Sequence, residues 1–448
     1  MNYIRRIFIK IAKMSTGFRF GHFHQNNMLG WLIIAYISSC CITTLSLFGI
    51  YQIQIPEVIF LLLIPLGIRY IKDTRQVTKL DTILFIYLII FLVNAIFHPN
   101  AKTLTEVLGT FYVVIMSHIF SRFLAFKNNF EVYLPKAIYG LFFTSVITGL
   151  AGYLLHITGI TNYFGHFYGN YPYFGDVWRL DGLTWCNLLV SCIMLSLLFL
   201  HIFEKDHKKL VYYTITGILV CALTLSKEIV ILITILVMLY VSKSYFVHYK
   251  KFFAFGSCSV ALFVGFMTFF AVRDKNLTFN ESSISNNSQI GEEILFSGEG
   301  YAFHGTTYFY LAKSAAELFT ENKVKGIGSG QFYDKILERQ KIGKYPASLT
   351  PYDTHGFYLG QLSELGIFYL LFLGLFLFES IQFLQNKLQL DKVHLLVLSS
   401  ILIYFLISYM VGGSKHYRHF WVFLGILNSY YLNNTIGRAE KVLISSNT

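Results

Sequence analysis

Long apolar runs alternate with short polar segments along most of the chain. An α-helix needs about 20 residues to cross a bilayer, and most of the runs approach that length. The pattern therefore predicts about twelve transmembrane helices in an all-α, polytopic membrane protein. The second, seventh and eighth runs are short for full spans. We place the runs at residues 31–50, 57–71, 81–98, 106–125, 137–158, 183–202, 211–226, 228–242, 253–272, 356–378, 394–411 and 419–435.

One polar segment, residues 273–355, is much longer than the others. Its first part, "NLTFNESSISNNSQIGEE", has a composition typical of disordered segments. Its later part contains "TTYFYLAKSAAELFTEN" and "QFYDKILERQK", whose apolar spacing predicts two helices. The sequence thus predicts a large, partly helical loop between the ninth and tenth spans. The expected organisation is an N-terminal segment (1–30), nine spans (31–272), the loop (273–355), three spans (356–435) and a tail (436–448).

The composition agrees with a membrane protein. Hydrophobic residues make up 55% and charged residues 13% of the chain, whereas soluble domains contain about 25% charged residues. The net charge of +12 does not indicate nucleic-acid binding, because the basic residues occupy short loops between apolar runs. The six cysteines lie inside apolar runs without metal-ligand spacing, so we expect neither disulfides nor a metal site.

The basic residues divide unevenly between the two sets of loops. If the N-terminus is cytoplasmic, the cytoplasmic segments contain 22 of the 36 lysines and arginines, and the short outer loops contain 5. An excess of positive charge in short loops marks the cytoplasmic side. We therefore expect both termini in the cytoplasm and the large loop outside.

Four of the basic residues in short outer loops suggest a ligand. Arg179 lies in "YPYFGDVWRLDGLTW", Lys227 in "LTLSKEIVI", and Lys415 and Arg418 in "GGSKHYRHFW". Positive charge on this side works against membrane insertion, so the presence of each basic residue there requires an explanation. One reason is a shared anionic ligand such as a lipid-linked pyrophosphate, which guanidinium binds as a fork and ammonium as a point charge. The alternative is a scatter of solvated loop charges.

A glycine-rich turn, "KGIGSGQF", follows the first predicted helix of the loop. Its residues Gly328, Ser329 and Gly330 could present backbone N–H groups to phosphate. The turn is not a P-loop, because no Gly-Lys-Ser/Thr follows and no strand precedes it. The alternative is a tight turn that ends a helix.

A histidine opens the tenth apolar run, "THGFYLGQLSELGIFYLL". His355 and Gly366 are eleven residues apart, about three turns, so on one continuous helix they share a face. A glycine on that face would let another helix approach. Glu364 would lie on the other side of the helix and two turns inside the apolar run, and a carboxylate at that depth is costly unless it is paired or neutral. On spacing alone, His355 is either a site residue or an interfacial histidine.

Four stretches, in order, resemble the O-antigen ligase and polymerase superfamily of bacterial inner-membrane glycosyltransferases. They are "RLDGLTWCNLL", "LTLSKEIVI", "AELFTENKVKGIGSGQF" and "THGFYLGQLSELGIFYLL", and the resemblance covers about residues 170–430. The last two stretches together are the more specific. Two positions depart from the family pattern: Lys227 stands where the family usually has arginine, and His304 is the only basic candidate where an arginine often precedes the loop helix.

The resemblance implies a C-type, all-helical glycosyltransferase acting at the periplasmic face. It would pass a glycan, with inversion, from an undecaprenyl-pyrophosphate donor to an acceptor sugar hydroxyl, without a required metal or other cofactor. Arg179 and Lys227, with Arg418, would hold the pyrophosphate and stabilise its charge as it leaves. His355 would either take the acceptor proton as general base or orient the acceptor.

Three functions are compatible with these features. The first is an O-antigen or related polysaccharide polymerase, whose acceptor is a second lipid-linked repeat unit and whose candidate partner is a chain-length regulator. The second is an O-antigen ligase, whose acceptor is lipid A–core. The third is a transporter or flippase for lipid-linked sugars, although such proteins usually show related halves and charged or broken helices at the midplane. A purely structural membrane protein is the remaining class. We expect a multi-pass protein of the bacterial inner membrane that contacts membrane lipid and no nucleic acid.

Overall fold

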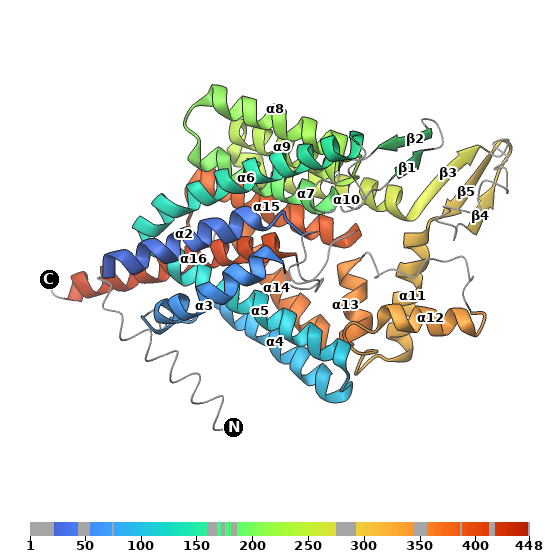
Figure 1. Ribbon diagram of the computed structural model, residues 1–448, viewed down its shortest axis with the longest axis horizontal. Helices are drawn as coiled ribbons and strands as arrows, with labels where there is room; N and C mark the ends of the chain where they lie inside the picture. Colours follow the sequence, from blue (N-terminus) through green and yellow to red (C-terminus); the bar gives the residue numbers. More distant parts are fainter. Residues whose placement is uncertain are drawn as a thin grey trace.

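The computed structural model describes residues 22–43, 54–73, 76–158, 168–171, 175–178, 180, 186–274, 293–344, 356–385, 388–411 and 417–446. The described chain is mostly helical, and every predicted apolar run overlaps a helix (Figure 1). The helices that match the apolar runs are α2 (His22–Ser39), α3 (Ile55–Asp73), α4 (Lys79–Phe97), α5 (Ala101–Leu124), α6 (Lys127–Ile157), α7 (Cys186–Phe203), α8 (His207–Leu223), α9 (Glu228–Ser244), α10 (Tyr249–Phe269), α13 (Phe357–Leu365), α14 (Phe368–Leu384), α15 (Lys392–Val411) and α16 (Arg418–Ser446).

Six helices in the described part of the chain are long and apolar enough to cross a membrane. These helices indicate a multi-pass membrane protein. The number of twelve spans stays a prediction. The short seventh and eighth runs correspond to α8 and α9, each of 17 residues. The six helical segments are Lys79–Phe97, Ala101–Leu124, Lys127–Gly152, Cys186–Phe203, Phe246–Phe269 and Lys392–Met410.

Two of the predicted runs need correction. Helix α2 begins at His22 and ends at Ser39, earlier than the apolar run of residues 31–50 suggests. The tenth run is not one helix, because α13 ends at Leu365 and α14 begins at Phe368. Gly366 therefore lies at a break between two helices, and the expectation of one continuous helix through this residue is wrong.

The long polar segment forms a small mixed unit at one end of the bundle, which we call the cap (residues 270–274 and 293–344). Strands β3 (Phe270–Asp274), β5 (Tyr301–Gly305) and β4 (Glu293–Ser297) form an antiparallel sheet in that order. They are followed by α11 (Thr307–Glu321) and α12 (Phe332–Lys341), which are the two helices predicted for this segment. A second antiparallel pair, β1 (Tyr168–Tyr171) and β2 (Gly175–Trp178), lies at the same end.

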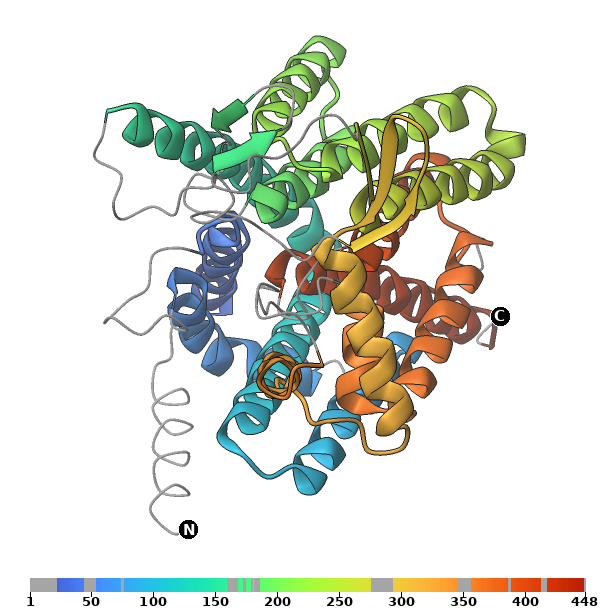
Figure 2. The ribbon, with the colours of Figure 1, turned by 90° about the vertical axis from the view of Figure 1, so that its right-hand side faces the viewer.

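Figure 1 places both sheets, α11 and α12 at the right-hand end of the bundle, while α16 ends at the left. Viewed from the cap end, α11 crosses in front of the helix bundle (Figure 2). The strands were not predicted by an all-α reading, because each has only four or five residues and lacks an apolar run of its own. We refer to the two ends of the bundle as the cap end and the far end.

The cap has its own small core and its own ion pairs. Leu311, Leu318 and Phe332 belong to a buried cluster separate from the core of the bundle. Arg339 of α12, which is largely buried, contacts Glu317 and Glu321 of α11. These contacts hold α11 and α12 together. Lys344 adds a further contact to Glu321 at 3.2 Å, and this hydrogen bond raises the pKa of Lys344 above its ordinary value.

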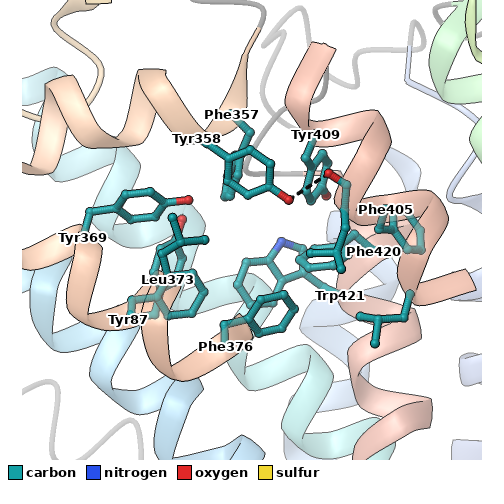
Figure 3. A pocket seen from close by; sticks show the side chains of 13 residues that line it. Tyr87, Phe357, Tyr358, Tyr369, Leu373, Phe376, Phe405, Tyr409, Phe420 and Trp421 are labelled. Carbon is teal, nitrogen blue, oxygen red and sulfur yellow. Dashed lines mark hydrogen bonds between the residues drawn. The ribbon is translucent and has the colours of Figure 1, made fainter. Parts of the chain in front are cut away.

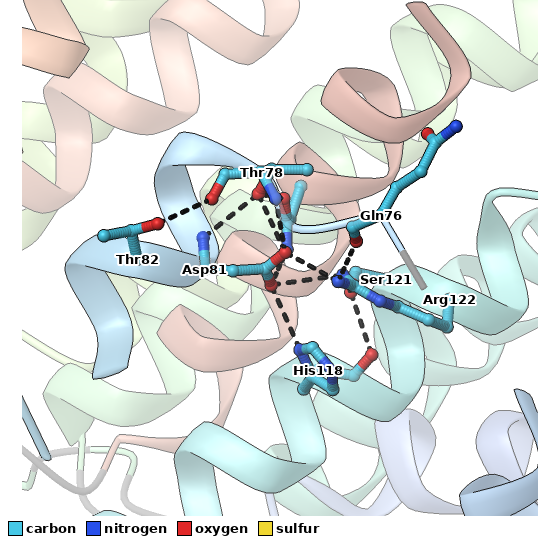
Figure 4. Close-up of polar contacts among 8 residues, drawn as sticks. Gln76, Thr78, Asp81, Thr82, His118, Ser121 and Arg122 are labelled. Carbon is cyan, nitrogen blue, oxygen red and sulfur yellow. Dashed lines mark hydrogen bonds and ion pairs between the residues drawn. The ribbon is translucent and has the colours of Figure 1, made fainter. Parts of the chain in front are cut away.

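A buried polar network joins α4, α5 and α16 toward the far end (Figure 4). Both terminal nitrogens of Arg122 donate to the Asp81 carboxylate, at 3.1 and 2.6 Å. His118 Nδ1 lies 3.0 Å from the same carboxylate, and Asn428 Nδ2 donates to it at 2.8 Å. Thr78 caps α4 through reciprocal bonds with Asp81. A buried ion pair is tolerated when further hydrogen bonds surround it, and here the Asp81 carboxylate has additional donors and both terminal nitrogens of Arg122 have additional acceptors.

Candidate functional site

Three of the predicted site residues, Arg179, His355 and Lys415, lie outside the described residues, but their neighbours Leu180 and Gly356 are described. Leu180 is fully buried, and its N–H donates to Leu223 O at 3.0 Å. Leu223 ends α8, four residues before Lys227. The chain next to Arg179 is therefore fixed beside the turn that carries Lys227, so two of the four family-like stretches meet.

A tight turn between α8 and α9 presents Lys227 at the cap end. Leu225 has a φ of 49°, a left-handed value that bulky residues rarely adopt. The turn leaves Lys227 exposed immediately before the first residue of α9. Lys227 Nζ lies 5.1 Å from the centre of the Tyr308 ring in α11, which is a cation–π distance. The cap thus lies directly against the predicted phosphate-binding lysine.

The residue after Lys227 anchors this turn inside the bundle. Glu228 is buried, and its carboxylate accepts hydrogen bonds from Ser191 at 3.2 Å, Tyr404 at 3.1 Å and Ser408 at 3.2 Å. Glu228 also lies at the positive end of the α9 dipole, which stabilises a carboxylate. Its partners come from α7 and α15, so the start of α9 is held in place. Sequence reasoning missed Glu228, although a carboxylate at the start of an apolar helix was visible in the sequence.

The start of α13 contacts the same part of α15. Phe357 stacks on Tyr409 with ring centres 4.8 Å apart, and the Tyr358 hydroxyl donates to Leu406 O at 2.9 Å. Phe357 follows His355 by two residues. The backbone leading out of the predicted histidine is therefore fixed against α15 at the cap end.

Residues 404–409 of α15 therefore connect two of the predicted site stretches. Glu228, next to Lys227, binds the side chains of Tyr404 and Ser408, and the first turn of α13 packs on residues 406 and 409. This part of α15 rises by roughly 8 Å along the helix axis. In addition, α11 packs against α13 and supplies the Tyr308 that contacts Lys227. The chain segments next to Lys227 and His355 thus share two neighbouring helices.

Arg418 is engaged within the protein. Its Nε donates to Glu57 Oε1 at 2.7 Å and its terminal nitrogen donates to Gln54 Oε1 at 2.7 Å. The Arg418 side chain is 12% exposed and that of Glu57 20% exposed. A carboxylate that already neutralises the guanidinium argues against the expected role of Arg418 in binding pyrophosphate. The partner is 361 residues away in sequence, so local patterns could not reveal it.

The glycine-rich turn of the cap also uses its polar groups internally. Gly326, Gly328 and Gly330 all have positive φ, between 68° and 99°. Gly328 N donates to Glu364 O at 3.1 Å, Ser329 N to Asn94 Oδ1 at 2.9 Å, and Gly330 N to Glu364 Oε1 at 3.0 Å. These donors are committed within the chain, which argues against the expectation that Gly328, Ser329 and Gly330 bind phosphate through their amides. The turn instead holds the cap to the bundle.

Glu364 has the partner that its depth required. Besides Gly330 N, its carboxylate accepts a hydrogen bond from Gln361 Nε2 at 3.3 Å. The turn approaches the α13–α14 break so closely that a Cβ on Gly326 would lie 2.2 Å from Glu364 O, and one on Gly366 would lie 2.4 Å from Val324 O. Only glycine fits at either position. The close contact between the two backbones therefore accounts for Gly326 in the glycine-rich turn and for Gly366 after the predicted histidine.

Lys102, the remaining basic residue of the short outer loops, contacts the cap. Its Nζ lies 2.7 and 2.6 Å from the two carboxylate oxygens of Asp334 in α12. Among the described residues, no group of three or more His, Cys, Asp or Glu side chains is arranged to bind a metal. Of the predicted basic residues that the structure describes, Lys227 is the one whose position at the cap end best suits an anionic ligand.

These contacts define a candidate site where α9, α11, α13 and α15 meet at the cap end, with Lys227 as its described cation. In comparisons with known proteins, no family model and no curated protein matches the chain.

Proposed function

We propose that the protein is an inner-membrane glycosyltransferase that polymerises a surface polysaccharide from undecaprenyl-pyrophosphate-linked repeat units. The observation that carries the proposal is the meeting of the Lys227 turn and the start of α13 on residues 404–409 of α15, beneath α11. This arrangement brings the neighbours of a cation and of a histidine to one end of the bundle. The cap end would face the periplasm.

In this proposal Lys227 and Arg179 bind the pyrophosphate of the donor. Lys227 acts as a point charge and Arg179 as a planar fork, so the two contribute different geometry. Leu180, the residue after Arg179 in the sequence, is bonded to Leu223 at the end of the helix that precedes Lys227, and this contact supports the pairing. Arg418 is left out of the clamp, because releasing it would leave the Glu57 carboxylate without its positively charged partner.

The reaction would be a direct displacement. The acceptor hydroxyl oxygen forms a bond to the anomeric carbon, the bond from that carbon to the pyrophosphate oxygen breaks, and the electron pair leaves with the pyrophosphate. The acceptor proton passes to the His355 imidazole, whose ordinary pKa near 6.5 suits a general base. Because pyrophosphate is a good leaving group, charge stabilisation and positioning can supply much of the rate enhancement.

An O-antigen ligase would use the same donor site with lipid A–core as the acceptor. Deleting the gene in a strain with a known surface glycan separates the two functions. A polymerase mutant would leave a single repeat unit on the core, whereas a ligase mutant would leave none.

A transporter is favoured by one observation, the broken helix α13–α14, because discontinuous helices often form transport sites. In transporters the helix ends at such a break bind substrate or ions. Here Ser363 O and Glu364 O accept from Ile327 and Gly328 of the cap, so these groups are already used. Purified protein in vesicles with a synthetic pyrophosphoryl-lipid oligosaccharide would distinguish chain extension from movement of the lipid across the bilayer.

The same assay tests the site residues. We expect Arg179→Ala and His355→Ala to abolish transfer at normal protein levels, and Lys227→Gln to weaken donor binding, while Lys227→Arg stays active because the charge is kept. Lys102→Gln is a matched control, since Lys102 lies at the same end of the bundle but pairs with Asp334. Full activity of Arg179→Ala would overturn the pyrophosphate clamp.

A further inference from the structure

Helix α10 is the most exposed of the six apolar spans in the described part of the chain. Only 28% of its apolar segment is buried inside the protein, compared with 50–83% for the other five. Phe255, Leu262 and Phe266 are exposed and follow one another at spacings of seven and four residues, so they lie on one side of the helix. On a membrane-spanning helix, an exposed apolar side of this kind faces lipid.

Strand β3 continues directly from α10, because the helix ends at Phe269 and the strand begins at Phe270 (Figure 1). Alternate residues of a strand lie on the same face of a sheet. Phe270 and Val272 therefore share a face with Phe303, which is directly opposite Val272 in β5. The Phe303 ring centre lies 5.2 Å from that of Phe270 and 5.8 Å from that of Phe266 in α10. The lipid-facing side of α10 thus continues into one face of the sheet.

This face of the sheet is apolar and exposed, and we call it the aromatic face (Phe270, Val272, Phe296, Tyr301 and Phe303). Phe296 of β4 is directly opposite Phe303, and Tyr301 lies two residues before Phe303 in β5. The exposed fractions are 60% for Phe296, 56% for Val272 and 47% for Tyr301. Large apolar side chains that are grouped and exposed mark a surface that contacts a partner or a membrane.

A second copy of the chain is a poor fit to the aromatic face. Three strands of five residues cover roughly 250 Å² at the usual strand spacing and rise. A specific protein interface buries about 800 Å² on each partner. The face is therefore too small to hold a stable dimer by itself. A lipid surface does not need so large an area, because the spans already anchor the chain in the membrane.

The interior of the bundle offers lipid little room in the described part of the chain. Figure 3 shows an aromatic cavity enclosed by α4, α13, α14, α15 and α16. Its volume is about 20 Å³, which is far too small for a lipid chain. We therefore look for lipid contact at the cap end on the outer surface, where the aromatic face is exposed.

We propose that the aromatic face lies against the lipid leaflet at the cap end and contacts its headgroup region. Aromatic side chains, tyrosine among them, are characteristic of this level of a membrane. The outer edges of β3 and β4 are not paired within the sheet, and hydrocarbon cannot satisfy open edges, so the sheet stays where water is present. Glu299 is exposed in the turn between β4 and β5, which agrees with a hairpin tip in water. The inference does not depend on the proposed transferase activity.

Contact with the leaflet would fix the height of the cap above the bilayer. Thr306, which precedes α11, donates from its N–H to Phe269 O at 2.9 Å and from its hydroxyl to Thr268 O at 2.6 Å. The sheet and the start of α11 are thus joined to the last turn of α10. Tyr308 in the first turn of α11 contacts Lys227. The membrane surface would therefore help to position α11 over the Lys227 turn.

The test measures how deeply the aromatic face lies in a membrane. The full chain carries Cys258→Ser and one nitroxide label, attached at Phe296→Cys or, as an independent second position, at Val272→Cys. Each nanodisc contains one chain in phosphatidylethanolamine and phosphatidylglycerol. Collisions of the label with oxygen, which concentrates in the bilayer, are compared with collisions with a water-soluble nickel chelate. Leu262→Cys on α10 is the control in lipid, and Glu338→Cys on α12, whose side chain is 61% exposed, is the control in water.

We expect both sheet labels to give an oxygen-to-nickel collision ratio above that of the α12 control and below that of the α10 control. A ratio equal to that of the α12 control would place the sheet in water and overturn the proposal. A ratio equal to that of the α10 control would place it in hydrocarbon and overturn the assignment to the headgroup region. Protection from nickel that appears only in nanodiscs with two chains, together with broadening between the labels, would assign the face to a second copy and also overturn the proposal.

Discussion

The side chain of Asn94 connects α4 to both the cap and α13 through three hydrogen bonds. Its Nδ2 donates to Lys325 O at 3.0 Å and to Glu364 O at 3.1 Å. Its Oδ1 accepts from Ser329 N at 2.9 Å. Asn94 lies near the end of α4 and is buried, so its position is set by the bundle. One amide group therefore aligns the glycine-rich turn with the end of α13.

Replacing Asn94 by alanine should lower the free energy of unfolding by about 2–4 kcal/mol, because it leaves a buried Ser329 N–H without an acceptor. Chemical or thermal unfolding in detergent measures this loss. Asn433→Ala is the matched control, because Asn433 is exposed on α16 and surface substitutions usually change stability by less than about 0.5 kcal/mol. Equal losses in the two variants would contradict the structural role of Asn94.

Tyr308 should influence donor binding through its contact with Lys227. Removing the ring in Tyr308→Leu should raise KM for the donor about two- to fivefold, since an exposed cation–π contact contributes about 0.5–1 kcal/mol. Tyr308→Phe keeps the ring and should stay near the native KM. Steady-state kinetics on the lipid-linked donor distinguish the two variants. If Tyr308→Phe were as impaired as Tyr308→Leu, the hydroxyl and not the ring would be the important group.

The break between α13 and α14 depends on the backbone conformation of Gly366. Gly366 has φ 68° and ψ −155°, a region that is essentially restricted to glycine. Its N–H donates to Leu362 O, and the next residue, Ile367, donates to Lys323 O in the cap. The break is therefore shaped jointly by one residue and by a segment far away in sequence.

Gly366→Ala should destabilise the protein by about 2 kcal/mol or more, from backbone strain and from the clash of the new Cβ with Val324 O. Gly374→Ala serves as the control: a Cβ there meets nothing within 4 Å, and alanine favours a helix interior by up to about 1 kcal/mol. The two variants should thus shift the unfolding transition in opposite directions. A stable Gly366→Ala protein would show that the break can be replaced by a continuous helix.

Helices that have an apolar pattern in the sequence could be predicted. The contacts between residues far apart in the chain could not. The apolar runs located the helices of the bundle, and apolar spacing located α11 and α12. The helix break was missed because a glycine inside an apolar run has the same local pattern whether the helix continues or ends. The pairs Arg418–Glu57 and Glu228–Tyr404 join segments 361 and 176 residues apart, so no local pattern could reveal them.

The candidate site could be predicted only in part, for the same reason. Lys227 was identified as a charge on the expected outer side, and its position at the cap end agrees with that reasoning. The sequence suggests a ligand for the glycine-rich turn and for Arg418, because their partners within the protein are far away along the chain and leave no local pattern. Arg179, His355 and Lys415 lie outside the described residues, so their roles remain predictions.

At the scale of the whole molecule, the charge distribution predicts that the cap faces outward and the α7–α8 connection faces the cytoplasm. Thiol labelling can test this orientation, because Cys258 is the exposed cysteine and the other five are buried. In a Cys258→Ser background, Val324→Cys in the cap should react with a membrane-impermeant reagent in spheroplasts. Lys208→Cys, at the start of α8, should react only after permeabilisation. The reverse pattern would invert the proposed topology.

The Asp81–Arg122 pair bears on how the chain is made. Asp81 and Arg122 belong to consecutive helices, α4 and α5, so they can meet as soon as that hairpin has left the ribosome. Two opposite charges that enter the bilayer together as a neutral unit avoid the cost that each would have alone. Asn428 belongs to the last helix and can bond to Asp81 only when synthesis is nearly finished. A chain that stops before α16 would thus keep an incomplete polar cluster in the membrane, a feature by which cellular quality control could detect it.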